Sequence, residues 1–301
     1  MPQEGLNWLS RTELLSFPEM LRTCSLLVKM GVEKIRITGG EPFVRKGIMP
    51  FLAELSKLEG LHRLSVTTNG VLTAPLVPEL KKLGIQSVNL SLDTLDRDRF
   101  FAITYRDELP QVLHTLEELL RHGIKVKINA VVMEGKNTQD IFALAELTKD
   151  LPVEMRFIEQ MPFNGREAGF SGIVWNHTRI LNELQQYYPG IRKAVDPPFS
   201  TAYNYLIPGH QGTVGIIAAY TRSFCGSCNR IRITAQGALM TCLYGEAVLN
   251  IRDLFRSGLP DEAVQTALLR AIMNREQDGW QAEEKSMQKH PLHESMAAIG
   301  G

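Results

Sequence analysis

The chain has 301 residues, of which 44% are hydrophobic and 22% charged, which is enough apolar material for a buried core. Its 33 lysines and arginines balance its 33 aspartates and glutamates, so no net charge favours nucleic acid or a membrane surface as a partner. No apolar run approaches the roughly 20 residues of a membrane span, and the N-terminus lacks the pattern of a signal peptide, so the sequence predicts a cytoplasmic globular protein.

Strands alternate with helices through the first half of the chain. The Ser-x-x-Glu pattern from Ser10 to Glu13 predicts the start of a helix that ends at Gly31. This alternation indicates a parallel sheet, arranged either as an open sheet or as a barrel. The predicted strands span residues 32–40, 64–68, 87–92, 126–132 and 153–158, and the later helices span residues 48–58, 73–83, 109–122 and 138–149.

One face of these predicted strands is polar. Lys34 and Arg36 share a face of the first strand, Lys127 and Asn129 share a face of the fourth, and Arg156 continues the pattern on the fifth. Parallel strands buried on both faces are almost continuously apolar, which these are not. The polar residues therefore line either a barrel lumen that suits a polyphosphate or a half-exposed sheet face with solvated charges.

The regular alternation ends after the fifth strand. A helix is predicted at residues 178–188, a Pro-rich break at 196–198, short strands at 201–207 and 213–220, and helices at 251–257 and 262–277. The composition of the C-terminal tail predicts a disordered end. We therefore predict two domains, residues 1–196 and residues 197–301.

Three of the four cysteines lie close together in the sequence. Cys225 and Cys228 form a Cys-x2-Cys pair, and Cys242 follows after a predicted strand and turn. Three thiolates suit an iron–sulfur cluster, a zinc site with His210 as fourth ligand, or, without metal, a cysteine-rich core. The fourth cysteine, Cys24, lies among apolar residues of the first helix and is predicted to be a core residue.

Two further sets of residues have the character of ligand-binding groups. Arg230 and Arg232 lie on one side of a predicted strand, where two guanidinium groups bind a phosphate or carboxylate if they do not simply face solvent. The loop at residues 38–42 follows a strand end, and its two glycines allow a ligand to approach the backbone, although a tight turn alone also explains them. Glu41 in this loop offers a carboxylate to an amine or a ribose.

Seven short motifs together resemble the GTP 3′,8-cyclase family of molybdenum cofactor biosynthesis, whose members are radical S-adenosylmethionine enzymes. The resemblance implies an α/β fold, namely an incomplete (βα)6 barrel that here misses its first strand, followed by a C-terminal α+β region that carries a [4Fe-4S] cluster. The motifs are TGGEP at 38–42, TTNG at 67–70, NLSLD at 89–93, KVKIN at 125–129, MRFIEQM at 155–161, FCGSCNRIRIT at 224–234 and the final Gly-Gly.

The resemblance also assigns roles to individual residues. The cluster ligands that it implies are Cys225, Cys228 and Cys242. The residues that it places at S-adenosylmethionine are Gly40, Glu41, Ser91 and Met161. The residues that it places at GTP are Lys34, Arg36, Thr67, Lys127, Arg156, Arg230, Ile231 and Arg232. The residues that it implies in catalysis are Arg230, Arg232, Gly300 and Gly301, and it overturns the disordered interpretation of the tail.

The family reaction sets the expected partners. A 5′-deoxyadenosyl radical abstracts the ribose 3′ hydrogen of GTP, and the carbon radical attacks C8 of guanine to give 3′,8-cyclo-7,8-dihydroguanosine 5′-triphosphate. The resemblance implies cyclic pyranopterin monophosphate synthase as the next enzyme, a reductant such as flavodoxin or ferredoxin, and a homodimer, without nucleic acid or membrane partners.

The sequence departs from the family at its N-terminus. Members carry a Cys-x3-Cys-x2-Cys motif whose last cysteine precedes a Met-Pro stretch like Met1-Pro2, and this sequence starts there. We therefore expect a truncated form that is inactive by itself. The alternatives are a GTP-binding or zinc-stabilised scaffold without catalysis, and a radical enzyme that uses its C-terminal cluster on another substrate, such as a peptide.

Overall fold

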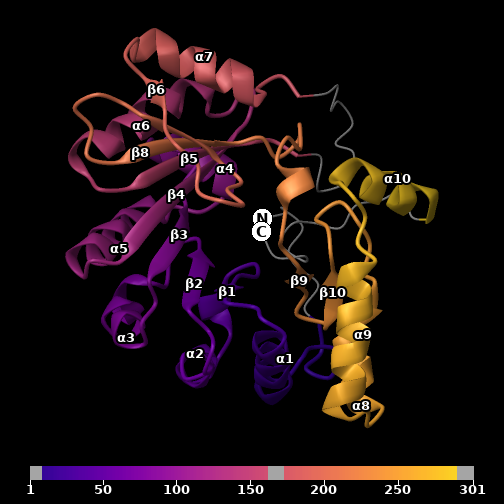
Figure 1. The fold of residues 1–301 in the computed structure, drawn as a ribbon. Helices are drawn as coiled ribbons and strands as arrows, with labels where there is room; N and C mark the ends of the chain where they lie inside the picture. Colours follow the sequence, from indigo (N-terminus) through magenta and orange to yellow (C-terminus); the bar gives the residue numbers. More distant parts are fainter. Residues whose placement is uncertain (1–8, 162–172, 290–301) are drawn as a thin grey trace. The chain divides into compact units, whose positions relative to one another are not determined.

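The computed structural model in Figure 1 describes residues 9–161 and 173–289. These residues form two compact units. Unit 1 contains residues 66–161 and 173–228, and unit 2 contains residues 9–65 and 229–289. The domain boundary between residues 196 and 197 lies inside unit 1 and stays a prediction.

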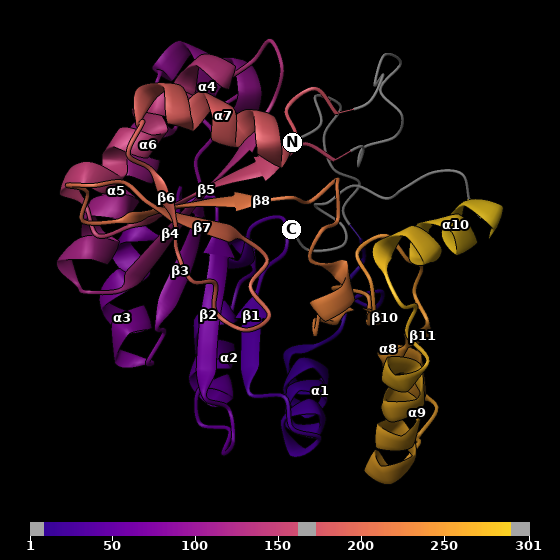
Figure 2. The same cartoon turned by 45° about the horizontal axis from the view of Figure 1, so that its top comes forward.

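The main sheet has eight strands in the order β1-β2-β3-β4-β5-β8-β7-β6. Strands β3, β4, β5 and β8 are parallel neighbours, whereas β7 pairs with β8 in antiparallel fashion and β6 pairs with β7 in the same way. Figure 2 shows β8 between β5 and β7. The predicted α/β class is therefore confirmed. The strand bounds are β1 Lys34–Ile37, β2 Arg63–Thr68, β3 Ser87–Ser91, β4 Lys125–Val132, β5 Glu154–Glu159, β6 Arg192–Lys193, β7 Tyr203–Leu206 and β8 Thr213–Ile217.

The core of unit 1 lies on the apolar face of these strands. Alternate residues such as Leu90, Ile128 and Phe157 are fully buried, as the period of two in each strand requires. Two of the predicted helices begin with a 3-10 turn, at Ala74–Leu76 and Thr138–Asp140. The helices of unit 1 are α3 Val77–Lys82, α4 Arg97–Thr104, α5 Leu109–Arg121, α6 Ile141–Asp150 and α7 His177–Tyr187.

Unit 2 is built around a second apolar core. Side chains of α1, α8 and α9 pack with Leu239 of β10, and Ile231 and Ile233 lie against the same cluster. Strands β9, β10 and β11 form an antiparallel sheet with β10 in the middle. The bounds are α1 Phe17–Lys29, α2 Ile48–Leu55, β9 Arg232–Ile233, β10 Ala238–Met240, β11 Leu249–Asn250, α8 Ile251–Arg256, α9 Asp261–Met273 and α10 Gly279–Lys289.

The first helix begins later than the Ser10 pattern predicts. Helix α1 starts at Phe17, where Ser16 and Glu19 form a complete capping box. Ser10 and Glu13 make similar hydrogen bonds, with the Ser10 hydroxyl 2.7 Å from a Glu13 carboxylate oxygen, but they close only a turn. The difference arises because Pro18 has no N–H and its ring would clash with the carbonyl four residues earlier in a longer helix.

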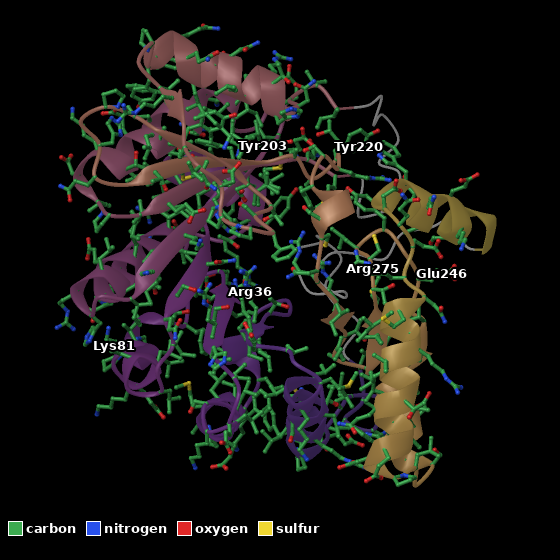
Figure 3. The ribbon with its side chains drawn as sticks, in the orientation of Figure 1. Arg36, Lys81, Tyr203, Tyr220, Glu246 and Arg275 are labelled. Carbon is green, nitrogen blue, oxygen red and sulfur yellow. The ribbon has the colours of Figure 1, made fainter. Side chains whose placement is uncertain are left out.

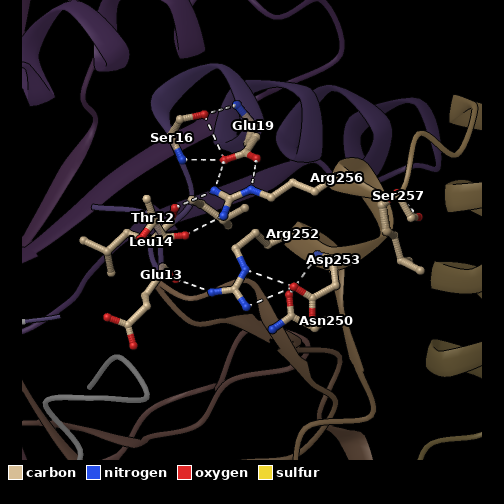
Figure 4. Close-up of polar contacts among 12 residues, drawn as sticks. Thr12, Glu13, Leu14, Ser16, Glu19, Asn250, Arg252, Asp253, Arg256 and Ser257 are labelled. Carbon is tan, nitrogen blue, oxygen red and sulfur yellow. Dashed lines mark hydrogen bonds and ion pairs between the residues drawn. The ribbon is translucent and has the colours of Figure 1, made fainter. Parts of the chain in front are cut away.

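Two arginines of α8 bind the segment that precedes α1 (Figure 4). Arg256 donates to the carbonyl of Leu14 at 3.0 Å and to the Glu19 carboxylate at 2.9 Å. Arg252 donates to the carbonyl of Glu13. These hydrogen bonds fix the chain before α1 on helix α8 within unit 2. Of the helices that the structure describes, none is both long and apolar enough to span a bilayer.

Candidate functional site

The polar faces of β3, β4 and β5 come into register in unit 1. Asn89 of β3 lies opposite Lys127 of β4, which lies opposite Glu154 of β5. Residues opposite one another on neighbouring strands share one face of the sheet, so these side chains form a row. A second row, one step nearer the carboxyl ends of the strands, contains Ser91, Asn129 and Arg156.

Glu154 joins the two cations of this face. Its carboxylate accepts from Lys127 Nζ at 2.6 Å and from Arg156 Nε at 2.5 Å. Burial opposes ionisation of Glu154, but Arg156 and Lys127 outweigh it and hold the pKa of its carboxyl below the usual value. The three side chains therefore carry one net positive charge, and this partly buried network can accept an anion.

Two amide oxygens on the same face have no hydrogen-bond partner among the described residues. They are Oδ1 of Asn89, whose residue is only 2% exposed, and Oδ1 of Asn129. Buried polar atoms are nearly always hydrogen-bonded, so an unpaired carbonyl oxygen indicates a place for a water or a ligand. Because both atoms are acceptors, the missing group is an N–H or O–H donor.

The remaining predicted residues of unit 1 lie at strand ends. Ser91 is the last residue of β3, Thr67 is the next to last of β2, and Met161 follows the end of β5 by two residues. The carboxyl ends of the parallel strands β3 and β5 lie at one edge of the sheet, which is where α/β proteins bind ligands.

Cys225 and Cys228 lie on a single 3-10 turn after β8. Residues Cys225–Ser227 form the turn, and the Cys228 N–H donates to the Cys225 carbonyl at 3.1 Å. Because a 3-10 helix has three residues per turn, these two side chains leave the backbone on the same side. The turn therefore presents two thiols in one direction.

His210 does not join these cysteines. It precedes the start of β8, whereas the cysteines follow the end of that strand. Its Nδ1 lies 2.8 Å from the Thr148 hydroxyl, and its side chain is buried against α6. The alternative in which His210 supplies a fourth zinc ligand is therefore wrong.

In unit 2, β1 and the following loop carry four of the predicted residues. Lys34 and Arg36 are on the exposed face of β1, and Figure 3 labels Arg36 there. Glu41 caps the 3-10 turn Pro42–Val44 by accepting from the Phe43 N–H at 3.2 Å. A Cβ on Gly40 would meet no atom within 4 Å, so the backbone there is open to a neighbouring group. The loop thus has both a structural cap and an accessible backbone.

The arginine stretch of unit 2 lies at the β9–β10 hairpin. Ile231 packs against the core of unit 2, and Arg232 lies on β9 opposite Met240 of β10. Arg230 precedes this pair on one strand and Cys242 follows it on the other, so both lie at the same end of the hairpin. Arg230 and Arg232 are half-buried.

The complete set of predicted ligands is not assembled within the described residues. Cys225 and Cys228 belong to unit 1 and Cys242 to unit 2. Within the two described ranges, no three His, Cys, Asp or Glu side chains are grouped so that they could hold a metal ion. Gly300 and Gly301 lie outside the described residues. The site assignment as a whole stays a prediction.

Cys24 is only partly buried in α1, so the prediction of a core residue holds in part. Burial raises the pKa of its thiol to about 12, so the thiol stays protonated at neutral pH. It is therefore an inert residue of the helix rather than a metal ligand.

Two sequence families match this chain. Residues 7–148 match the Radical SAM superfamily, and residues 153–280 match the family described as Molybdenum Cofactor Synthesis C. The two matches meet at the start of β5, so the main sheet contains parts of both.

Curated relatives cover nearly the whole chain. GTP 3′,8-cyclase of Geobacter sulfurreducens is 38% identical over 306 residues, covering 100% of this chain and 91% of that protein. The mitochondrial GTP 3′,8-cyclase of Arabidopsis thaliana is 39% identical over 282 residues, covering 91% of this chain and 70% of that protein. Human molybdenum cofactor biosynthesis protein 1 is 40% identical over 273 residues, and there the chain spans 42% of the relative's length.

Solved structures share the fold at low sequence identity. SuiB of Streptococcus suis bound to S-adenosylmethionine has a TM-score of 0.57 and 15% identity, covering 84% of this chain and 61% of that chain. The anSMEcpe structure with bound AdoMet has a TM-score of 0.56 and 14% identity, covering 91% of this chain and 75% of that chain. These similarities are to the fold alone, and they confirm the predicted α/β architecture with a C-terminal α+β region.

Proposed function

The chain belongs to the GTP 3′,8-cyclase family, and we propose that it cyclises GTP to 3′,8-cyclo-7,8-dihydroguanosine 5′-triphosphate, the first step of molybdenum cofactor biosynthesis. The main support is the bridge by which Glu154 joins Lys127 of its own row to Arg156 of the next row, beside the buried, unpaired oxygen of Asn89. Such a face offers positive charge to a polyphosphate and an acceptor to the N–H or O–H groups of a nucleoside.

The thiols of this chain fit the cluster that the family requires. The turn at Cys225 and Cys228 presents two thiols on one side, and Cys242 is the proposed third ligand. Three thiolates match an iron–sulfur cluster with one position left for another ligand. When bound, this cluster would supply an open iron for an atom of the substrate, whereas S-adenosylmethionine would supply the radical only after taking one electron from the cluster that the Cys-x3-Cys-x2-Cys motif of the family holds.

The protein side chains then hold and orient the two small molecules. The proposed contacts of S-adenosylmethionine are Gly40, Glu41, Ser91 and Met161. Lysines and arginines bind the phosphates because they keep their charge at neutral pH and form multiple hydrogen bonds with phosphate oxygens. The proposed contacts of GTP are Lys34, Arg36, Thr67, Lys127, Arg156, Arg230, Ile231 and Arg232. Arg230, Arg232, Gly300 and Gly301 complete the proposed catalytic set.

The wider setting is part of the same proposal. It places the protein in the cytoplasm as a homodimer, supplied with electrons by a flavodoxin or ferredoxin. Its product would pass to cyclic pyranopterin monophosphate synthase.

Anaerobic reconstitution with iron and sulfide tests this function. We expect at least about four irons and four sulfides per chain, in line with a four-iron cluster. We also expect GTP to change the electron paramagnetic resonance spectrum of the reduced protein. We expect the cyclised nucleotide only where the Cys-x3-Cys-x2-Cys motif of the family is present, so mass spectrometry with S-adenosylmethionine and dithionite compares this chain with one that also carries the motif. Tight zinc without iron would contradict the proposal, and GTP binding without turnover even with the motif present would favour a GTP-binding scaffold.

A further inference from the structure

Glu159 is a fully buried carboxylate at the end of β5, with an exposed fraction of 0%. It lies on the apolar side of that strand, since residues 155, 157 and 159 are the buried positions of an alternating pattern. A charge at such a position is costly unless several donors satisfy it. The proposed GTP site does not use this residue.

Two segments of unit 1 donate hydrogen bonds to this carboxylate, namely the start of α7 and the loop after β8. The backbone N–H groups of Tyr220 and Thr221 reach Oε2 at 2.9 and 2.8 Å. The backbone N–H of His177, the first residue of α7, reaches Oε1 at 2.6 Å, and the Thr221 hydroxyl lies 3.0 Å from the same oxygen. The His177 ring Nδ1 is 3.3 Å away. Glu159 therefore joins the end of β5, the start of α7 and the loop after β8.

The loop that Glu159 holds leads directly to the cysteine turn. Figure 3 labels Tyr220 in this loop. After Thr221, the backbone of Arg222 adopts a left-handed conformation with φ of 55°. Its carbonyl accepts from the Cys225 N–H at 3.0 Å, and the Cys225 carbonyl accepts in turn from the Cys228 N–H. Hydrogen bonds thus hold Thr221 to the Glu159 carboxylate, and the next residue, Arg222, is hydrogen-bonded to the cysteine turn.

Glu159 is also close in sequence to the proposed S-adenosylmethionine contact. Met161, the proposed contact of S-adenosylmethionine, follows Glu159 by two residues. We propose that Glu159 is a positioning residue that fixes the Cys225–Cys228 turn to the carboxyl end of β5. This inference rests on the proposed function, because it assumes that the cysteines hold a cluster. The attachment of the loop to Glu159 can still be measured in protein that contains no cluster.

The test compares Glu159→Ala and Glu159→Gln with Asp140→Asn as a matched control. Asp140 is another buried carboxylate of unit 1, and it accepts from Nε of Arg99 at 2.8 Å and from one terminal nitrogen of the same side chain at 2.7 Å. Each variant is compared with wild type in thermal stability, hydrogen exchange, iron content and the resonance spectrum of the reduced cluster.

We expect the Tyr220 and Thr221 amides to exchange about tenfold faster or more in Glu159→Ala, because each loses a charge-assisted hydrogen bond. Iron content should fall and the cluster spectrum should change. Glu159→Gln should recover part of the iron content and part of the wild-type spectrum, since glutamine keeps one acceptor oxygen. Asp140→Asn should lower the melting temperature without changing the exchange of these two amides or the spectrum.

The proposal would be overturned if Glu159→Ala lost as much stability as Asp140→Asn but left amide exchange and the cluster spectrum unchanged. Glu159 would then have only a structural role. Thr221→Val provides a milder variant if Glu159→Ala does not fold, and it should speed exchange in the same loop. If wild type itself takes up no iron, the proposed cluster is wrong, and hydrogen exchange still decides whether Glu159 positions the loop.

Discussion

Lys127 and Glu154 lie opposite each other on the neighbouring parallel strands β4 and β5, with Nζ 2.6 Å from Oε2. A bound triphosphate competes with this carboxylate for the two cations it joins. We expect Glu154→Gln to bind GTP about fivefold more tightly, because removing a negative charge a few ångströms away is worth about 1 kcal/mol at the edge of a protein interior. Isothermal titration calorimetry under anaerobic conditions measures the difference.

The control for this prediction is Glu118→Gln, which removes a carboxylate paired with Arg121 on the surface of α5. Its GTP affinity should equal that of wild type. The gain in Glu154→Gln should shrink as salt is raised, since added ions screen the charge. Weaker binding would instead mean that Glu154 orients Lys127 and Arg156 more than it competes with the nucleotide.

Replacement of single cysteines should separate ligands from core residues. Cys24→Ala should retain the iron content of wild type, because burial raises the pKa of this thiol to about 12 and keeps it protonated. Cys228→Ala should lose most of the iron, because it removes one thiolate of the proposed trio. Iron and sulfide analysis after identical reconstitution gives the comparison. Loss of iron in Cys24→Ala alone would contradict both assignments.

The sequence predicts the strands of this fold better than its helices. Strand positions follow from the alternation of polar and apolar residues, which burial reproduces residue by residue in β4. Helix α4 has only Phe100 buried and α10 has few apolar residues, so neither shows the apolar stripe by which helices are recognised. The predicted start of the first helix is too early because two Ser-x-x-Glu patterns occur within ten residues, and only the second avoids the restriction from Pro18.

Part of the candidate site was predictable in the same way. Alternation places Lys127 and Arg156 on a polar face, but the bridge through Glu154 depends on the register of two strands that are separated by a helix. Glu159 is not among the site residues that the sequence predicts. The available signal was a glutamate at a position where the alternation of β5 demands an apolar side chain.

Glu19 links the start of α1 to α8, and its effect should depend on pH (Figure 4). The hydrogen bonds from Arg256, more than those from Ser16, lower the pKa of Glu19 from 4.5 to about 2. A carboxyl whose pKa is lowered on folding stabilises the protein fully above its unfolded pKa and loses this effect as pH falls through its folded pKa. The contribution should therefore be constant above pH 4.5 and disappear as pH approaches about 2.

We expect Glu19→Ala to lower the free energy of unfolding by about 1–2 kcal/mol at pH 7, through loss of the capping box and the ion pair. Urea titrations between pH 7 and pH 3 measure the difference, which should narrow at the acid end. Glu54→Ala is the control, since it removes an exposed pair with Lys57 that is worth less than about 1 kcal/mol. A difference independent of pH would mean that the ion pair with Arg256 contributes nothing.

Gly237 is the one residue of the β9–β10 turn that a side chain would disrupt directly. Its φ is 89°. A Cβ added to Gly237 would lie 2.8 Å from the Cβ of Arg252 and 2.9 Å from the backbone nitrogen of Arg252. Gly237→Ala should therefore destabilise unit 2 by about 2 kcal/mol or more, because it adds backbone strain to a contact with α8 that cannot yield. Urea denaturation measures the loss.

Gly245→Ala is the control. Its added Cβ would have its nearest contacts at 3.6 Å, so it should change stability by less than about 0.5 kcal/mol. Because the hairpin carries Arg232, Gly237→Ala should also weaken GTP binding, and unchanged affinity would argue against a role for β9 in holding the nucleotide.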